Sequence, residues 1–235
     1  MIKDKVIYKM KIEVKNISKK YQNREVLKDV SFTIEKGAIC GLFGMNGVGK
    51  STLMKIIYGI EIPDKGQVLF EGHGKTSNIG ALIEQPPVYS NLSAFDNLKT
   101  KALLYDIPNN QIKDILKRVG LDSTDKKHVG KFSVGMKQRL GIGMAILTQP
   151  KFIILDEPTN GLDPDGVIEF LDLLKSLKKQ GVTILISSHQ LHEIGRIVDQ
   201  VIILDKGHVV YDKIQSNYKD IEEIFFNVMK GESFI

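Results

Sequence analysis

A glycine-rich stretch followed by lysine and serine carries the clearest chemical signal in this 235-residue sequence. Its spacing matches G-x-x-x-x-G-K-S/T, between an apolar run and a segment that favours a helix. Glycines leave backbone N–H groups free to wrap an anion, while the Lys50 ammonium would neutralise phosphate oxygens and the Ser51 hydroxyl would ligate Mg²⁺. The pattern predicts a phosphate-binding loop; a chance glycine-rich turn is the alternative. The loop consists of Gly44, Met45, Asn46, Gly47, Val48, Gly49, Lys50, Ser51 and Thr52.

Two successive carboxylates are the second chemical signal. Asp156 and Glu157 follow the apolar run 152–155, which is typical of a buried strand. Successive side chains of a strand point to opposite faces, so we expect Asp156 to hold Mg²⁺ and Glu157 to orient the attacking water as a general base. His189 ends a further apolar run, 182–188, from which it would reach a terminal phosphate. The alternatives are a solvated strand end for the carboxylates and a structural role for the histidine.

Strand-like and helix-like segments alternate around these groups. Strands that alternate with helices after such a loop favour a mostly parallel sheet, with ligands at the carboxyl ends of its strands. Ahead of the loop, apolar and polar residues alternate from Met10 to Tyr21 and over Val26–Ile34, which predicts two antiparallel strands. The expected fold class is therefore α/β with an N-terminal antiparallel layer. Further strands are expected at 38–43, 67–70, 78–84, 182–187, 200–205 and 208–211, and helices at 52–60, 167–179 and 191–198.

A helical subdomain is expected across about 90–148. The pattern from Leu92 to Lys117 is helical with a break at Pro108, and a second helix is expected at 137–147. Ser93 and Asn109 are candidate N-caps, because their side chains can accept hydrogen bonds from the first turn. Residues 10–235 would form one domain, residues 1–9 a short extension, and the tail shows weak helical periodicity.

Composition limits the classes of protein. No apolar run reaches 18 residues, so no membrane-spanning helix is predicted, and the N-terminus lacks the apolar core of a secretory signal. Cys40 is the only cysteine, which excludes an intramolecular disulfide and suits a buried residue in a cytoplasmic protein. The net charge of +5 is mild and its lysines are scattered, which favours solvated faces, or weak attraction to an anionic membrane, over nucleic-acid binding.

In sequence order, these motifs resemble the nucleotide-binding domain of ATP-binding cassette (ABC) transporters, a P-loop NTPase with a RecA-like core. The Walker B strand matches 153–157, the D-loop matches 161–163 and the switch histidine matches His189. The resemblance implies ATP and Mg²⁺ as cofactors, ATP hydrolysis as the activity, and Asp163 as a nucleotide-site residue. Tyr21 stands where the family stacks an aromatic ring on adenine, although a surface turn residue is the alternative.

Two departures from the family pattern stand out. The signature, usually Leu-Ser-Gly-Gly-Gln, is Phe-Ser-Val-Gly-Met at 132–136. Ser133 and Gly135 remain, and the resemblance implies that they grip the γ-phosphate bound by the opposite subunit of a head-to-tail dimer. The second departure is Glu84, which aligns with the usual Q-loop glutamine. Its carboxylate could still hold a Mg²⁺-bound water, so we expect a catalytic and metal role for it.

These departures narrow the resemblance to ATPase subunits of lantibiotic self-immunity transporters of the nisin type. That group implies a cytoplasmic ATPase, peripheral on the inner face of the membrane, with separate transmembrane permease subunits. The complex would expel a lantibiotic peptide from the producer's membrane, and no nucleic acid would be bound. The alternatives are export of bacitracin-like or other peptides, an ABC ATPase acting on nucleic acid, and a translation-associated ABC protein. The last two usually carry coiled coils or two cassettes, which this chain lacks.

Overall fold

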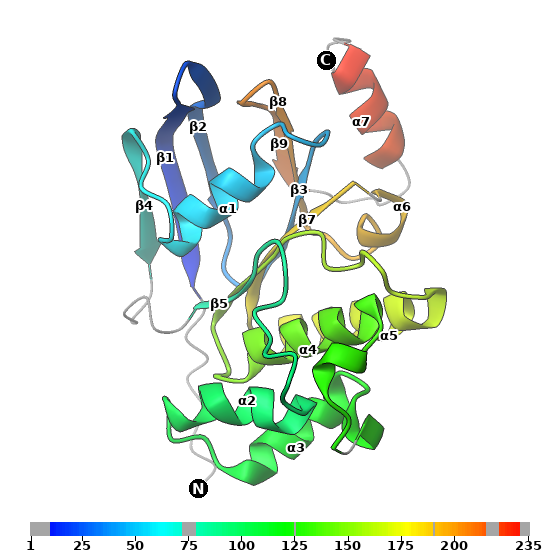
Figure 1. The fold of residues 1–235 in the computed structure, drawn as a ribbon. Coiled ribbons are helices and arrows are strands. Elements are labelled where there is room, and N and C mark those ends of the chain that lie inside the picture. Colours follow the sequence, from blue (N-terminus) through cyan, green and yellow to red (C-terminus); the bar gives the residue numbers. More distant parts are fainter. Residues whose placement is uncertain (1–9, 72–78, 125, 190, 215–220, 231–235) are drawn as a thin grey trace, which may run out of the picture.

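The computed structural model describes residues 10–71, 79–124, 126–189, 191–214 and 221–230. Expectations for residues 1–9, for Asn78 at the start of a predicted strand, and for parts of the tail lie outside this range. The described chain forms two sheets, a group of helices below them and a C-terminal helix (Figure 1). Within it, no helix is both long enough and apolar enough to cross a membrane.

The larger sheet has six strands and confirms the expected mostly parallel arrangement. Neighbours run parallel except for the last two, which pair antiparallel as a hairpin. The central strand β7 lies between the strand before the phosphate loop and the strand before the carboxylates, so all three carboxyl ends meet at one edge. In spatial order the strands are β5 (Ile79–Leu82), β6 (Phe152–Leu155), β7 (Thr183–Ser188), β3 (Ile39–Phe43), β8 (Gln200–Asp205) and β9 (His208–Ile214).

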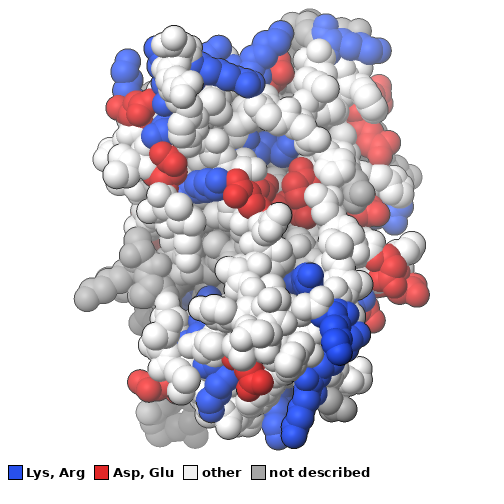
Figure 2. Space-filling view, in the orientation of Figure 1, with Lys and Arg blue, Asp and Glu red and all other residues white. Residues whose placement is uncertain are grey.

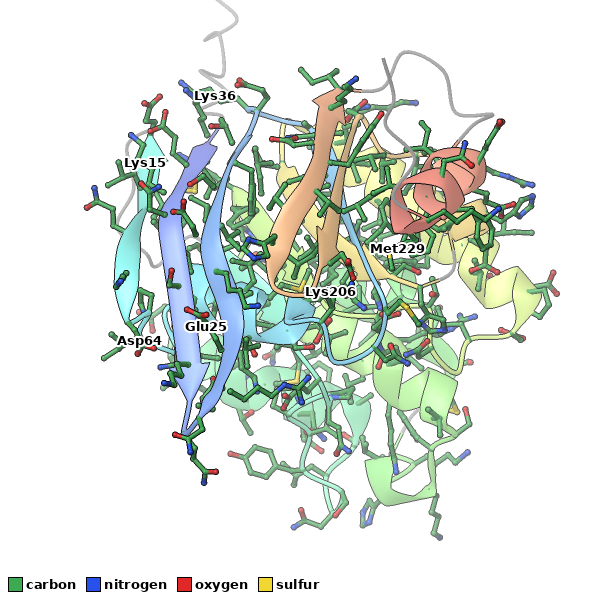
Figure 3. The ribbon with its side chains drawn as sticks, turned by 90° about the horizontal axis from the view of Figure 1, so that it is seen from above. Lys15, Glu25, Lys36, Asp64, Lys206 and Met229 are labelled. Atoms are coloured by element: carbon green, nitrogen blue, oxygen red, sulfur yellow. The ribbon has the colours of Figure 1, made fainter. Side chains whose placement is uncertain are left out.

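The antiparallel layer is a separate three-stranded sheet in the order β2-β1-β4. It confirms the two predicted strands, β1 (Lys11–Tyr21) and β2 (Arg24–Ile34), and adds β4 (Lys65–Glu71) on the far side of β1. Seen from above, Lys15, Glu25 and Asp64 mark this layer at one side of the molecule (Figure 3).

A helical group confirms the predicted subdomain. Ser93 is the N-cap of α2, and its hydroxyl accepts the Asp96 N–H. The expected cap at Asn109 is wrong: Pro108, in extended conformation, is the cap and Asn109 is the first helical residue. Pro108 has a ψ of 155°, an extended backbone angle, so the first helical residue is the one after it. The group contains α2 (Ala94–Leu103), α3 (Asn109–Arg118), the short helices η2 (Asp122–Thr124) and η3 (Val129–Lys131), and α4 (Val134–Ile146).

Four further helices complete the described fold. The helix after the phosphate loop begins at Lys50 rather than at Thr52, and it ends before Gly59, whose left-handed backbone (φ 89°) closes it. The helix after β7 is shorter than expected, and β9 runs three residues past the predicted end at Tyr211. These helices are α1 (Lys50–Tyr58), α5 (Pro164–Lys179), α6 (Leu191–Ile194) and α7 (Ile221–Lys230).

Two hydrophobic cores lie on the two faces of the large sheet. In β3, Ile39 and Phe43 face a core shared with α2, α3, α4 and α5. Cys40 and Leu42 alternate with them and face a second core, shared with α1 and the antiparallel layer. Cys40 is fully buried there, as expected, and burial raises the pKa of its thiol well above the usual range. Met229 of α7 packs on the edge of the first core (Figure 3).

Candidate nucleotide-binding site

The phosphate loop connects β3 to α1, and its glycines are required sterically. Gly44 has φ 154° and Gly49 has φ 116°. A Cβ on Gly44 would lie 2.4 Å from the Leu204 carbonyl oxygen, and one on Gly49 would lie 2.8 Å from a Leu27 methyl carbon. Both separations are too short for real atoms. At Gly44 the obstacle is the backbone of β8, and at Gly49 it is the Leu27 side chain, with the Val26 carbonyl oxygen 3.0 Å away.

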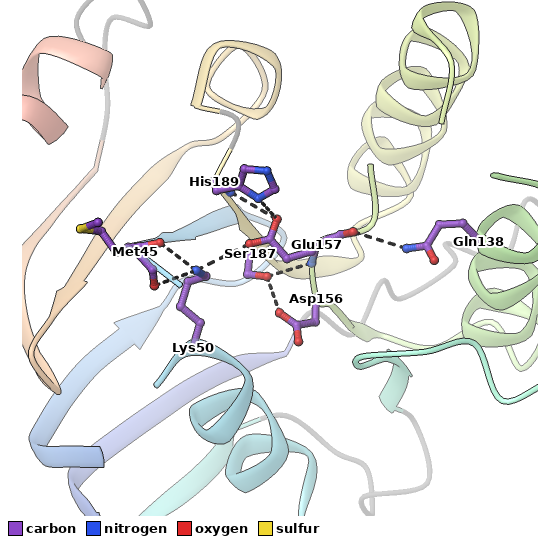
Figure 4. Close-up of polar contacts among 8 residues, drawn as sticks. Met45, Lys50, Gln138, Asp156, Glu157, Ser187 and His189 are labelled. Carbon is purple, nitrogen blue, oxygen red and sulfur yellow. Dashed lines mark hydrogen bonds and ion pairs between the residues drawn. The ribbon is translucent and has the colours of Figure 1, made fainter. Parts of the chain in front are cut away.

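Lys50 is buried at the bottom of the loop, with 6% of its surface exposed. Its ammonium donates to the Gly44 carbonyl (2.7 Å) and the Met45 carbonyl (3.3 Å), and it lies 3.6 Å from Glu157 Oε1 (Figure 4). That carboxylate oxygen is buried and has no hydrogen-bond partner among the described residues. The loop therefore holds a positive charge where a phosphate oxygen would be attracted.

The two carboxylates lie just beyond β6, which ends at Leu155. The prediction that strand alternation sets their directions is therefore wrong. The directions are set by a turn in which Glu157 adopts left-handed backbone angles (φ 47°). Asp156 is buried, with 4% of its surface exposed. Glu157 Oε2 lies 2.7 Å from His189 Nδ1 and accepts the His189 backbone N–H at 3.3 Å (Figure 4). The fold thus brings Lys50, Glu157 and His189 into one cluster.

Two residues of this cluster were missed by sequence reasoning. Ser187, inside β7, donates its hydroxyl to Asp156 Oδ1 at 2.6 Å and accepts the Glu157 N–H at 2.9 Å. Gln138 of α4 donates to the Glu157 carbonyl at 3.4 Å. A polar residue within an apolar segment could have indicated them. Ser187 lies in an otherwise apolar strand just before the histidine, and Gln138 lies on a helix face that is buried.

A cavity of about 180 Å³ brings several residues of the phosphate loop together with Asp156, one of the predicted metal ligands. Hydroxyl groups of Ser51 and Thr52 share its walls with the carboxylate of Asp156, an all-oxygen set that suits Mg²⁺. The described residues contain no cluster of three or more potential metal-binding side chains. Mg²⁺ is usually held by one or two carboxylates together with substrate phosphates. The lining residues are Val26, Asn46, Gly47, Gly49, Lys50, Ser51, Thr52, Asp156 and Glu157.

Glu84 lies past β5 with left-handed backbone angles (φ 61°), and it forms an ion pair with Lys55 of α1. The hydrogen bond from Lys55 to Glu84 raises the pKa of the lysine. Glu84 also shares the lining of a cavity of about 640 Å³ with Asp156 and Glu157. Glu84 and Asp156 therefore border one cavity, but the partner of the Glu84 carboxylate in this structure is a lysine of the phosphate-loop helix.

Ser133, Gly135 and Asp163 lie together but away from the phosphate loop. They line a separate cavity of about 390 Å³, which shares no lining residue with the cavity beside Lys50. Ser133 caps α4 by accepting the Met136 N–H, and Asp163 caps α5 by accepting the Gly166 N–H. A Cβ on Gly135 would lie 2.6 Å from the Gly161 carbonyl oxygen, so glycine is required where the signature meets the D-loop.

Tyr21 stands at the exposed end of β1, with 42% of its surface accessible. The ammonium of Lys19 lies 5.2 Å from the centre of its ring. From the antiparallel layer, Val26 rather than Tyr21 lines the phosphate-loop cavity. The proposed contact with adenine therefore stays a prediction.

The comparisons with known proteins agree with this geometry. The family described as "ABC transporter" matches residues 27–160, more than half of the chain. This chain belongs to the ABC transporter family. It is an ATPase of that family, as the sequence predicted. A second family, described as "AAA domain, putative AbiEii toxin, Type IV TA system", matches residues 127–195.

Curated relatives of this ABC ATPase span nearly its whole length. The lantibiotic transport ATP-binding protein SrtF of Streptococcus pyogenes is 41% identical over 92% of this chain and 96% of its own. The bacitracin transport ATP-binding protein BcrA of Bacillus licheniformis is 40% identical over 93% of this chain and 71% of its own. The predicted resemblance to lantibiotic transport ATPases is thus confirmed as a similarity of sequence.

Solved structures confirm the fold. An ATP-binding subunit of an ABC transporter superposes with a TM-score of 0.80, at 30% identity, over 92% of this chain and 93% of its own. A dimeric ATP-binding cassette in a post-hydrolysis state, bound to ADP and phosphate, superposes with a TM-score of 0.79 at 24% identity, over 88% of this chain and 99% of its own.

Proposed function

We propose that this ABC ATPase is the energy-supplying subunit of an exporter that expels a lantibiotic peptide from the producer's membrane. The similarity to a lantibiotic transport ATP-binding protein, 41% identity over 92% of the chain, carries this proposal. Glu84 supports it, because a carboxylate at the Q-loop position is one of the two departures from the family pattern that this group shares.

The proposed hydrolysis uses residues that the fold has already gathered. The N–H groups of the phosphate loop and the Lys50 ammonium bind the phosphates of ATP, and Ser51 and Asp156 hold Mg²⁺. When bound there, Mg²⁺ would supply positive charge against the charge that develops on the phosphates. Glu157 accepts a proton from the attacking water, while His189, 2.7 Å from Glu157 Oε2, orients that carboxylate.

Two copies are proposed to act as a head-to-tail dimer. Ser133 and Gly135 are in a cavity separate from Lys50, so one chain does not bring the signature to its own phosphate loop. A second copy would supply it. The exposed N-terminus of α4 would then direct its positive helix end at the γ-phosphate bound by the partner.

Attachment to the membrane is proposed to occur through separate permease subunits, which residues 84–97 would contact. The helical subdomain supports this placement by its charge. Residues 90–148 contain eight lysines, two arginines, five aspartates and no glutamate, which accounts for the whole net charge of +5. Figure 2 shows these basic side chains gathered over the lower part of the face, where Figure 1 places the helices. An anionic lipid surface would attract this part most strongly.

Deletion of the gene in its native host tests the proposal. The deletion strain should become sensitive to the host's own or a nisin-type lantibiotic, and the wild-type gene should restore resistance where Lys50→Ala does not. Unchanged sensitivity would contradict the immunity function.

A parallel challenge of the deletion strain with bacitracin tests whether bacitracin is the transported peptide. That alternative has its own support, since the relative BcrA is a bacitracin transport protein at 40% identity. Sensitivity to bacitracin alone would retain the exporter and change its substrate. Copurification of the tagged protein with DNA instead of membrane subunits would favour the nucleic-acid alternative.

A further inference from the structure

A buried serine joins the two carboxylates of the candidate site. Ser187 is the fifth residue of β7 and is completely buried. Its hydroxyl donates to Asp156 Oδ1 at 2.6 Å, and its oxygen accepts the Glu157 N–H at 2.9 Å (Figure 4). A hydroxyl has one hydrogen to donate, so these two bonds fix its orientation.

The bond to Asp156 acts on a carboxylate that water barely reaches, because 4% of the aspartate is exposed. A hydrogen bond to an ionised group in such surroundings is short and directional. It leaves Asp156 Oδ2 outside this bond and determines the plane of the carboxylate. The hydroxyl thus sets the orientation in which Asp156 faces the cavity that it shares with Ser51.

The bond to the Glu157 N–H acts on the turn that follows β6. Glu157 has a φ of 47°, in a region that side-chain-bearing residues seldom occupy. The turn is held on both sides: the Asp156 N–H donates to the Leu82 carbonyl at 2.8 Å, and Gln138 donates to the Glu157 carbonyl. Between these two bonds, Ser187 accepts the Glu157 N–H, and this bond directs the Glu157 side chain toward Lys50 and His189.

We propose that Ser187 is a positioning residue for ATP hydrolysis: its hydroxyl holds Asp156 in the orientation that binds Mg²⁺ and holds the backbone turn that aims Glu157. The inference rests on the proposed roles of Asp156 and Glu157. It adds a residue to that site which neither the sequence motifs nor the family resemblance assigned.

Thr183 provides a matched control on the same strand. It is also completely buried, and its hydroxyl likewise donates one bond, to the Met10 carbonyl at 2.7 Å, and accepts one, from the Gly37 N–H at 2.9 Å. It lies at the opposite end of β7 from the carboxylates. Thr183→Val removes a comparable hydroxyl without touching the candidate site.

The test measures the affinity of a fluorescent ADP analogue with and without Mg²⁺, the kcat and KM for ATP, and thermal unfolding of the purified full-length protein. Ser187→Ala should lose most of the increase in affinity that Mg²⁺ provides and keep its metal-free affinity. Its kcat should fall by about 10–100-fold, the usual effect of removing a group that orients a metal ligand. Thr183→Val should lower the unfolding temperature but keep the Mg²⁺ effect.

A second pair of variants isolates the hydroxyl if Ser187→Ala folds poorly. Ser187→Thr and Ser187→Val have nearly the same shape, and only the threonine carries the hydroxyl. The threonine variant should retain a larger Mg²⁺ effect and a higher kcat than the valine variant. Equal values for this pair, or the same loss of the Mg²⁺ effect in Thr183→Val, would overturn the inference. A wild-type protein with no Mg²⁺-dependent nucleotide binding would instead overturn the proposed site itself.

Discussion

At the scale of single residues, Glu157 has the most contacts that bear on hydrolysis. Its Oε1 lies 3.6 Å from the Lys50 ammonium nitrogen, and its Oε2 lies 2.7 Å from His189 Nδ1. Hydrogen bonds with Ser187 and Gln138 hold the Glu157 backbone. Such an arrangement would hold the proposed general base close to where a terminal phosphate is expected to bind.

Replacement of Glu157 by glutamine keeps the shape of the side chain and removes the carboxylate that we propose as the general base. We expect Glu157→Gln to slow ATP hydrolysis by about 10²–10⁴-fold, as loss of a general base typically does, and to leave ATP affinity nearly unchanged. Lys50→Ala, the control, should lose both ATP hydrolysis and ATP binding. Normal turnover of Glu157→Gln in a phosphate-release assay would rule out its role as base.

Glu84 and Lys55 form the second residue-scale pair. Both side chains are partly exposed, with 57% and 28% accessible, so their ion pair should contribute only about 0–1 kcal/mol to stability. We expect this ion pair to influence the charge at the candidate nucleotide-binding site, because an unpaired Glu84 would add negative charge near Asp156.

Four proteins test this coupling: wild type, Lys55→Gln, Glu84→Gln and the double variant. Lys55→Gln should reduce kcat several-fold in the wild-type background and have almost no effect in the Glu84→Gln background. Equal reductions in the two backgrounds would show that Lys55 acts independently of Glu84.

At the scale of elements, the loop after β5 is held by α2. Asn97 of α2 is completely buried, donates to the carbonyls of Tyr89 and Ser93, and accepts the Tyr89 N–H. The proposed permease-contacting segment is thereby fixed to the helical subdomain.

Asn97→Ala would leave backbone groups of Tyr89 without their partners. An unsatisfied buried polar group costs about 1–3 kcal/mol, so the unfolding temperature should fall and resistance to the transported peptide should weaken. Asn110→Ala, at an exposed asparagine of α3, is the control. An unfolding temperature equal to that of wild type would show that Asn97 does not hold this loop.

Lys101 links α2 to α4 by donating to the Met144 carbonyl at 2.9 Å. Burial lowers the pKa of its ammonium. Below the lowered pKa, the folded and unfolded chains both bind the proton, and the folded state bears the cost of the buried charge. Between the lowered value and the unfolded pKa of about 10.4, the unfolded chain binds more protons, so stability rises with pH.

Wild type should therefore gain stability relative to Lys101→Met as the pH is raised from 7.5 toward 10. Unfolding temperatures of both proteins across this range give the difference, and Lys113→Met, at an exposed lysine of α3, corrects for titration of the surface. A difference that stays constant or shrinks would contradict the burial of this charge.

At the scale of the whole molecule, the separation of two cavities leads to the proposed dimer. The signature residue Val134 is 69% exposed at the N-terminus of α4, next to Ser133 and Gly135. In a head-to-tail dimer it would face the phosphates bound by the partner.

A negative charge at this position should therefore prevent dimerisation without preventing ATP binding. In the Glu157→Gln background, which would retain ATP, we expect an ATP-dependent dimer by size exclusion with light scattering. Adding Val134→Glu should abolish it, while the neutral Val134→Gln should leave it intact. A dimer that persists with Val134→Glu would argue against this interface.

Features that depend on local spacing can be predicted from the amino-acid sequence. The phosphate loop, the alternation of strands and helices, the helical subdomain and the N-cap at Ser93 follow from patterns within about a dozen residues. Local errors arose where the pattern was ambiguous, as at Pro108 and Asn109, or where a strand ended one residue before a functional group, as at Leu155.

Contacts between residues far apart in the sequence emerge only from the folded arrangement. The placement of β7 between β3 and β6 brings Ser187 against Asp156 and Glu157, and no local pattern encodes that strand order. The pairing of Glu84 with Lys55 and the separation of the signature from the phosphate loop have the same origin. Such contacts are set by the packing of two hydrophobic cores on opposite faces of the sheet. Each core combines residues from many separate elements, so no single segment of the sequence predicts it.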